Sequence, residues 1–249
     1  MQIMPIKTHK ITKKDKSIFE ILDKYLPNLE EKSVVAVTSK IISITEGRII
    51  PIKKADKDEL VRKESELYID KSENAYGMYL TISDGKLAPT AGIDESNGNG
   101  YYMLWPKEPF GTAHEIRKHL LEKFKLKNLG VVITDSTTTP LRWGTTGVSI
   151  GHAGINPLND YIGKRDLFDY KMRVTKASIV DGLAAASVLA MGEGREQTPI
   201  AVIHGMPNVE FLETNPEDEK GKLRIEPDVD LYASLLKSAP WKKGKKSSI

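Results

Sequence analysis

Three segments of the sequence place acidic or hydroxyl side chains beside glycine. The first covers residues 91–100, AGIDESNGNG, and follows a predicted strand. The carboxylate of Asp94 offers hard oxygen ligands of the kind that Mg²⁺ or Mn²⁺ prefers, and the amide of Asn97 can hydrogen-bond a nucleotide. The same composition is typical of a tight Asx-turn loop that binds nothing. Composition by itself favours this second interpretation.

The second segment, ITDSTTTPLR, covers residues 133–142 and begins at the end of a predicted buried strand. Open α/β sheets place their ligand sites at the carboxyl ends of strands, which is where Asp135 is expected. Asp135 and Ser136 can bind a metal together, the hydroxyl groups that follow can contact phosphates, and Arg142 can pair with one. A plain Ser/Thr turn explains the segment equally well.

The third segment, LAMGEGREQ, covers residues 189–197. Glu193 can serve as a metal ligand, and its flanking residues Gly192 and Gly194 let the backbone approach a phosphate. A glycine that ends a helix explains the same pattern nearly as well. The sequence contains no Walker loop and no GxGxxG, and its histidines have no metal-ligand spacing. Only His152 lies in a glycine-rich stretch, which makes it a weaker functional candidate.

Hydrophobic periodicity predicts the elements that must position these side chains. We expect helices over residues 17–26, 57–69, 113–127 and 175–191, strands over residues 34–38, 48–52, 129–134 and 200–203, and a hairpin of residues 79–82 and 86–89. Because helices and strands alternate along the chain, the fold class is predicted to be mixed α/β (α+β). We expect one domain over residues 1–249, with a less regular lobe at about residues 140–175.

Composition excludes several classes of protein. The chain has 249 residues, no cysteine and a formal net charge of +3, so disulfides, thiolate catalysis and zinc–thiolate sites are ruled out and nucleic acid is not an expected partner. Its longest apolar stretch is far shorter than the roughly 20 residues that span a membrane. The start of the chain lacks the apolar core of a secretory signal, so we expect a cytoplasmic protein with no membrane partner. The basic cluster at residues 242–246 is predicted to be a solvated, frayed tail.

Taken in order, four runs of the sequence resemble the coenzyme F-420:gamma-glutamyl ligase family. They are VTSKIISITEGRI at residues 37–49, AGIDESN at 91–97, ITDSTTTPLRWGTTGVSIGHAG at 133–154 and RVTKASIVDGLAAASVLAMGEG at 173–194. The likeness extends from about residue 6 to residue 204. It implies an α/β fold without a P-loop, assembled as an intertwined homodimer. The apolar, glycine-rich stretch at residues 143–155 is a further reason to expect a dimer, since one small lobe would not bury it.

Members of this family join a substrate carboxylate to the amine of L-glutamate, using GTP and divalent metal ions. The resemblance implies a site for two Mg²⁺ or Mn²⁺ ions, held by Asp94, Asp135, Ser136 and Glu193. It implies catalytic roles for Asp94, Asp135 and Arg142. The implied nucleotide-binding residues are Thr8, His9, Lys10, Ile11, Ser39, Lys40, Asn97, Met191, Gly192, Glu193, Gly194, Arg195, Glu196, Gln197 and Thr198. We therefore expect the three acidic groups to converge although they are far apart in sequence.

The chemistry agrees with such a set of residues. A carboxylate does not react with an amine at neutral pH until it is activated, and phosphoryl transfer gives the reactive acyl phosphate. The chain departs from the family pattern at a few positions. Ile44 stands where a phosphate-binding lysine is expected, Thr138 and Thr139 replace a glycine–arginine pair, and Leu141 replaces a tryptophan. These changes concern the nucleotide and acceptor sides rather than the metal ligands.

Three functions remain open at this point. The first is a GTP-dependent gamma-glutamyl ligase that acts on a carboxylate of the deazaflavin coenzyme precursor. The second keeps the chemistry and takes a folate, tetrahydrofolate, as acceptor. The third is a catalytically inactive nucleotide-binding protein, which the missing lysine at position 44 favours and the retained acidic groups oppose. The sequence leaves open the acceptor, the number of glutamates added, and whether GTP or ATP is used.

Overall fold

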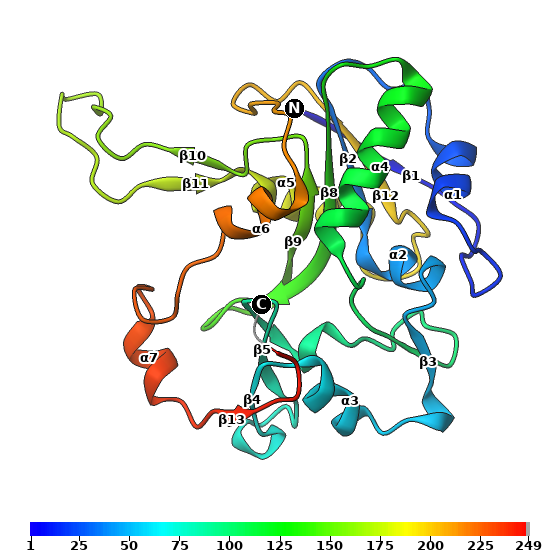
Figure 1. Ribbon diagram of the computed structural model, residues 1–249, viewed down its shortest axis with the longest axis vertical. Coiled ribbons are helices and arrows are strands. Elements are labelled where there is room, and N and C mark those ends of the chain that lie inside the picture. Colours follow the sequence, from blue (N-terminus) through cyan, green and yellow to red (C-terminus); the bar gives the residue numbers. More distant parts are fainter. Residues whose placement is uncertain (248–249) are drawn as a thin grey trace.

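The computed structural model describes residues 1–247 and is built on a five-stranded sheet with strand order β1-β12-β2-β8-β9 (Figure 1). The strands are β1 (Gln2–Ile6), β12 (Ile200–His204), β2 (Ser33–Thr38), β8 (Leu129–Thr138) and β9 (Thr145–Ala153). β2 and β8 run parallel, with Thr38 opposite Thr134, while the other neighbouring strands are antiparallel. The carboxyl ends of these two adjacent strands therefore meet at one edge of the sheet.

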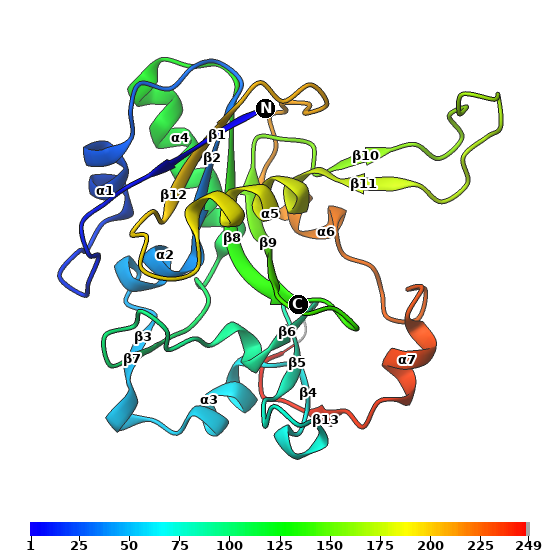
Figure 2. The ribbon, with the colours of Figure 1, turned by 180° about the vertical axis from the view of Figure 1, so that it is seen from behind.

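Helices cover both faces of this sheet (Figures 1 and 2). α1 (Ile18–Tyr25), α2 (Ser39–Thr45) and α4 (Pro109–Phe124) pack on one face, and α5 (Ile179–Met191) packs on the other. The sequence of β2 explains this arrangement, because Val35 and Val37 join the first helical layer while Val34 and Ala36 face α5. A strand that is apolar on both faces is typical of a sheet buried between two layers.

A second, smaller lobe lies below the main sheet in Figure 1. Its sheet has the order β13-β4-β5-β6, made of β13 (Lys242–Lys243), β4 (Leu67–Ile69), β5 (Leu80–Ser83) and β6 (Lys86–Pro89). It also contains α3 (Lys57–Glu64) and a ribbon of β3 (Ile49–Pro51) and β7 (Tyr101–Met103). A separate apolar cluster around Val61, Ile93 and Leu104 forms its core. This lobe carries residues 91–100, the first of the three chemical segments.

The remaining elements lie at the periphery. A two-stranded arm of β10 (Leu158–Asp160) and β11 (Lys176–Ser178) projects from the molecule, and the loop at its tip carries residues 161–175 (Figure 2). α6 (Pro216–Lys222) and α7 (Ala233–Ser238) follow β12. Within residues 1–247, no helix combines the length and apolar character needed to cross a membrane.

The main predicted strands and the first helix are confirmed, but three predicted helix boundaries are wrong. The helix expected over residues 57–69 ends at Glu64, because Leu67–Ile69 pairs with β5 as β4. The helix expected from residue 113 begins at Pro109, a favoured first helical residue, and ends at Phe124. The helix expected from residue 175 begins at Ile179 because Lys176–Ser178 forms β11; the Ser178 side chain caps it.

Two further expectations are corrected by the fold. The basic tail is not frayed over its lysines: Lys242–Lys243 pairs with β4, and Lys246 lies 2.8 Å from the Asp84 carboxylate. The stretch at residues 143–155 also differs from its prediction. Most of it is the edge strand β9, whose side chains from Ser149 onward are buried within this chain and do not require a partner subunit for burial, whereas Trp143 at the start of the stretch is 92% exposed. The less regular part of residues 140–175 is the arm.

Candidate active site

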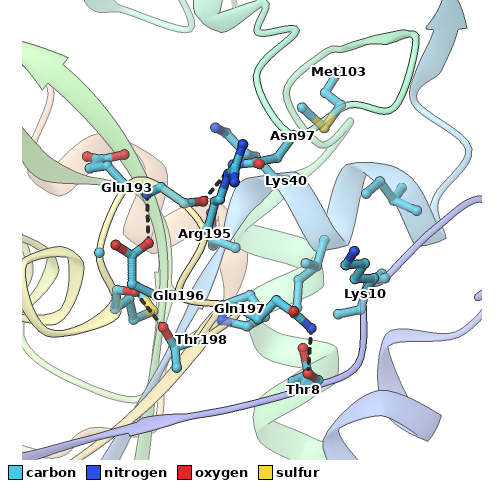
Figure 3. Close-up of a pocket in the computed structure, with 18 of the residues that line it drawn as sticks. Thr8, Lys10, Lys40, Asn97, Met103, Glu193, Arg195, Glu196, Gln197 and Thr198 are labelled. Carbon is cyan, nitrogen blue, oxygen red and sulfur yellow. Dashed lines mark hydrogen bonds between the residues drawn. The ribbon is translucent and has the colours of Figure 1, made fainter.

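The carboxyl edge of β2 and β8 opens into a cavity of about 790 Å³ (Figure 3). Five segments contribute to its wall: residues 8–12 after β1, residues 38–44 of β2 and α2, residues 97–103 up to the end of β7, residues 134–136 of β8, and residues 188–199. All the predicted nucleotide-binding residues except Ser39 line this cavity. Ser39 is buried in the first turn of α2, where its carbonyl oxygen accepts a hydrogen bond from the Ser43 hydroxyl at 2.9 Å.

Two loops far apart in sequence interlock on one side of the cavity. The backbone N–H of Thr8 donates to the carbonyl of Gln197 at 2.9 Å, and the Gln197 side-chain amide donates to the carbonyl of Thr8 at 3.1 Å (Figure 3). The second loop begins at Gly192, which ends α5 with φ of 77°. A Cβ at Gly192 would lie 2.5 Å from the carboxyl carbon of Glu196. Gly192 therefore both ends the helix and lets the loop fold back along the cavity.

Asp94 is held at the border of the small lobe. Its backbone pairs with that of Met103, which fixes the loop, and its carboxylate accepts hydrogen bonds from the Ser96 N–H and hydroxyl, each at 2.8 Å. The ammonium of Lys40 lies 2.6 Å from the same carboxylate. Burial opposes ionisation of Asp94, but Lys40 and Ser96 outweigh it, so its pKa is lowered. Lys40 therefore connects Asp94 to the cavity that Lys40 itself lines.

Asp135 stands where β8 changes register. The pairing of β8 with β9 shifts between Ile133 and Thr134, a bulge that re-aims the side chains that follow it. The Asp135 carboxylate accepts a hydrogen bond from the indole N–H of Trp105. Burial raises the pKa of Asp135 to about 6 despite this hydrogen bond. A carboxylate in such surroundings is stabilised by a nearby cation, so this position suits a cation or a cationic group.

The position of Trp105, the hydrogen-bond partner of Asp135, depends on Gly92 in the first chemical segment. Gly92 has φ of 69°, and a Cβ there would lie 2.1 Å from the Trp105 indole nitrogen. The glycine thus makes room for the indole that holds Asp135. Sequence reasoning assigned this segment to Asp94 and Asn97 and did not identify Trp105. The sequence carries no direct signal for this contact, because the burial of Trp105, which makes its indole N–H need an acceptor, is seen only in the structure.

The second and third segments also meet. The Ser136 hydroxyl donates to the Glu193 carboxylate at 2.6 Å, and the Asn97 amide donates to the carbonyl of Gly194 at 3.1 Å. These bonds connect β8 and the small lobe to the loop after α5. Ile44, which replaces an expected lysine, also lines the cavity, as do the cationic side chains of Lys10, Lys40 and Arg195 (Figure 3).

Other predicted residues are not brought into this arrangement. A smaller cavity of about 260 Å³ adjoins this one and is lined by β6, Trp105 and parts of β8 and β9. Arg142 lies in the exposed turn between β8 and β9 and lines neither cavity, because the hydroxyl run continues β8 to Thr138 instead of turning back. Within residues 1–247, no group of three or more His, Cys, Asp or Glu side chains is placed to hold a metal ion. Asp94 instead contacts Lys40, and Glu193 contacts Ser136. The predicted three-carboxylate cluster is therefore not preassembled.

His152 is fully buried away from both cavities. Its ring meets Phe110 edge-on, with centroids 5.2 Å apart, and neither ring nitrogen has a hydrogen-bond partner among the residues that the structure describes. Burial lowers the pKa of His152 to about 3. The imidazole is thus neutral at physiological pH and does not belong to the site.

Comparison with known proteins shows which family this chain resembles. A family model described as F420-0:Gamma-glutamyl ligase matches residues 5–205, which include every residue that lines the cavity. The chain is 33% identical over 200 residues to the coenzyme F420:L-glutamate ligase of Methanocaldococcus jannaschii, across 74% of this chain and 79% of that protein. It is 30% identical over 223 residues to the protein of the same name from Methanopyrus kandleri, across 82% and 86%. With that from Archaeoglobus fulgidus it shares 28% over 221 residues, across 83% and 88%.

Proposed function

The chain belongs to the F420-0:gamma-glutamyl ligase family, and from this premise we propose that it is an amide-forming ligase that joins L-glutamate to a carboxylate of the deazaflavin coenzyme precursor. The observation that carries the proposal is the cavity at the parallel strand ends. Asp135 stands on its wall beside cationic side chains and the backbone of residues 191–198. Cationic side chains and backbone groups on this wall suit the phosphates of a nucleoside triphosphate, with Asp135 beside them.

In the proposed reaction the nucleotide, GTP or ATP, lies in this cavity with its phosphates toward Lys10, Lys40 and Arg195. An oxygen of the acceptor carboxylate forms a bond to the γ-phosphorus, the bond to the bridging oxygen breaks, and a nucleoside diphosphate leaves. The amine of glutamate then attacks the acyl carbon. A C–N bond forms, the C–O bond to phosphate breaks, and phosphate and the amine proton are released. The protein contributes positioning and electrostatic stabilisation.

The donor types present suit the divalent ions that the family implies, although within residues 1–247 the three carboxylates are not grouped around one point. Asp94, Asp135 and Glu193 offer carboxylate oxygens and Ser136 a hydroxyl, which is the hard-oxygen set that Mg²⁺ and Mn²⁺ prefer. The burial that raises the pKa of Asp135 is a second reason, since a cation would offset it. We propose that these four residues hold two ions. When bound, the ions would neutralise charge on the phosphates and on the transferred group.

The chain's own groups then have separate tasks. Lys40 keeps Asp94 ionised through their 2.6 Å contact, and Trp105 orients the Asp135 carboxylate through its indole N–H. The interlocked loops at Thr8 and Gln197 close one side of the cavity and limit the entry of water, which would hydrolyse an acyl phosphate.

A folate is the second candidate acceptor. The replaced residues Thr138, Thr139 and Leu141 lie where β8 ends and the following turn begins, and all three are exposed. Different side chains at this end are compatible with a different acceptor and leave the cavity wall unchanged. An inactive nucleotide-binding protein is less favoured, because Asp94 keeps its contact with Lys40 and Asp135 keeps its hydrogen bond from Trp105.

We also propose that the protein is a homodimer. The loop at the tip of the arm exposes 97% of Leu167, 80% of Phe168 and 73% of Tyr170. An apolar cluster of this kind on a projecting arm is typical of a surface that a second chain covers.

The test incubates the purified protein with Mn²⁺, L-glutamate, GTP or ATP, and either the deazaflavin precursor or tetrahydrofolate. Mass spectrometry should show the deazaflavin precursor gaining one glutamyl unit, with one nucleoside diphosphate formed per bond. Product with tetrahydrofolate in place of the deazaflavin precursor would establish the second acceptor. Nucleotide binding without product from either acceptor would overturn the assignment as a ligase.

A further inference from the structure

A second cavity, of about 260 Å³, adjoins the first. Asp135 and Ser136 line both cavities, whereas the rest of the second wall comes from β6, Gly92, Trp105, Thr137 of β8 and Val148 of β9. Its polar side chains besides these two are Lys86 and Thr137, and its apolar side chains include Pro89, Trp105 and Val148. It is therefore a small cavity with one cationic side chain, and it meets the first cavity at Asp135 and Ser136.

Within residues 1–247, the Lys86 ammonium forms no ion pair. It lies over the ring of Phe110, whose centroid is 5.7 Å away. Asp84 and Asp181 are the carboxylates whose charge acts on it, and each is engaged elsewhere. Asp84 lies 2.8 Å from the Lys246 ammonium, and Asp181 accepts a hydrogen bond from the Ser178 hydroxyl at 2.7 Å.

The surroundings of Lys86 favour an anionic ligand. The half-buried position of Lys86 lowers its pKa, because desolvation and the charges of Lys246 and Arg224 together outweigh the opposing charges of Asp84 and Asp181. A cation that is partly withdrawn from water without an ion pair costs free energy, and a bound carboxylate would offset that cost. The apolar walls formed by Trp105 and Val148 suit the methylene groups that separate the charged ends of an amino acid.

We propose that this second cavity binds L-glutamate, with Lys86 as the counter-ion of one of its carboxylates and its amine at the wall formed by Asp135 and Ser136. The inference rests on the proposed function. The reaction requires the amine to reach the activated carboxylate beside the nucleotide, and the shared wall is where the two cavities meet. The small volume suits an amino acid and not a deazaflavin or a folate.

The first experiment measures binding without turnover. Wild-type protein saturated with Mn²⁺ and a non-hydrolysable GTP analogue is titrated with L-glutamate by calorimetry, and so are Lys86→Met, Lys86→Arg and Lys63→Met. Lys63 is an exposed residue of α3 and serves as the matched control. Lys86→Met should weaken glutamate binding about 10- to 100-fold, whereas Lys86→Arg should stay within a few-fold of wild type and Lys63→Met should equal it.

Several results would overturn the proposal. One is the absence of saturable glutamate binding by the wild type at millimolar concentration. Another is glutamate binding by Lys86→Met that equals that of the wild type. Loss of inorganic phosphate binding in Lys86→Met without loss of glutamate binding would assign the cavity to phosphate instead. Thermal melting checks that Lys86→Met is folded, as we expect, since the substitution removes an uncompensated charge; if it does not fold, the Lys86→Ala and Lys86→Gln variants carry the same comparison.

Steady-state kinetics separates this inference from the proposed function. Lys86→Met should raise the KM for glutamate about 10- to 100-fold while the KM values for nucleotide and acceptor stay near wild type. A rise in the acceptor KM alone would show that Lys86 binds the acceptor carboxylate and would overturn the glutamate assignment. If the wild type forms no product with any acceptor yet binds glutamate through Lys86, the proposed function fails while the glutamate site stands.

Discussion

Asp135 is costly for folding, and the proposed function gives it a role in the chemistry. Its pKa of about 6 lies above its ordinary value, because burial disfavours the ionised form. The folded protein therefore favours the protonated carboxyl, and the stability that this group contributes is present below about pH 4 and is lost as the pH rises through 6. At pH 7.5 the ionised carboxylate should destabilise the protein, unless a cation is bound, by on the order of 2–3 kcal/mol.

The first prediction is that Asp135→Asn stabilises the protein without metal or nucleotide. Asparagine removes the charge and still accepts the hydrogen bond from Trp105. Urea unfolding at pH 7.5 should give a higher free energy of unfolding for the variant, and the difference should vanish near pH 4. Ligase activity should be lost. Asp228→Asn, at a carboxylate that is 79% exposed, is the control and should change neither property appreciably. A less stable Asp135→Asn protein at pH 7.5 would contradict the prediction.

The second prediction concerns the contact between Gly92 and Trp105. Gly92→Ala should displace the indole and release Asp135, lowering the free energy of unfolding by about 2–4 kcal/mol and strongly reducing ligase activity. Gly47→Ala is a matched control, because Gly47 has φ of 73° but nothing within 4 Å of the added Cβ. Thermal unfolding and initial rates compare the two. Equal losses in both variants would show that backbone strain, and not the indole, explains the effect.

Among the elements, the interlocked loops at Thr8 and Gln197 join the start of the chain to the loop after α5. The third prediction is that Gln197→Ala raises the nucleotide Kd about three- to tenfold, since the variant loses one hydrogen bond but keeps the backbone bond between the same two residues. Titration with a fluorescent GTP analogue measures this. Gln2→Ala, an exposed residue of β1, should leave the Kd unchanged. An unaltered Kd for Gln197→Ala would show that the loops do not depend on this contact.

Sequence patterns predicted the elements that have a strong local signal. The apolar runs of β2, β8 and β12 and the capped helix α1 follow from their own residues. α2 was missed, because Ile41, Ile42 and Ile44 in SKIISIT favour a strand by intrinsic preference; packing of Ile41 and Ile42 on the sheet makes it a helix. β4 was read as helix for the reverse reason, since its pairing with β5 and β13 comes from distant sequence.

The site divides in a similar way. Asp94, Asp135 and Glu193 were predicted to be metal ligands because unusual local composition surrounds each of them, and that role stays a prediction. Trp105 was missed, and Lys86 also carried no signal, because their importance lies in what they contact. Trp105 donates a hydrogen bond to Asp135, 30 residues away in sequence. Lys86 belongs to the four-stranded sheet and lines the second cavity together with Trp105 and Asp135. No spacing rule within a single segment reveals such a contact.

For the whole molecule, the arm is the surface most open to a partner. The fourth prediction is that Phe168→Asp converts the proposed dimer into a monomer, because it places a charge where apolar side chains are exposed. Sedimentation velocity at micromolar concentration measures the change. Val229→Asp, at a residue that is 72% exposed and follows α6, should leave the wild-type species unchanged. A wild-type protein that is already monomeric would refute both the prediction and the proposed dimer.

The strand order has a consequence for how the protein is made. β12 lies between β1 and β2 in the sheet, although the ribosome synthesises it long after both of them. β1 and β2 therefore cannot complete this part of the sheet until β12, which ends at His204, has left the exit tunnel and paired with both of them. The loop at residues 191–198, to which the proposed function assigns nucleotide binding, emerges just before that strand. Nascent chains should therefore acquire nucleotide affinity late and abruptly, and their exposed early strands are the stage at which a chaperone would be needed.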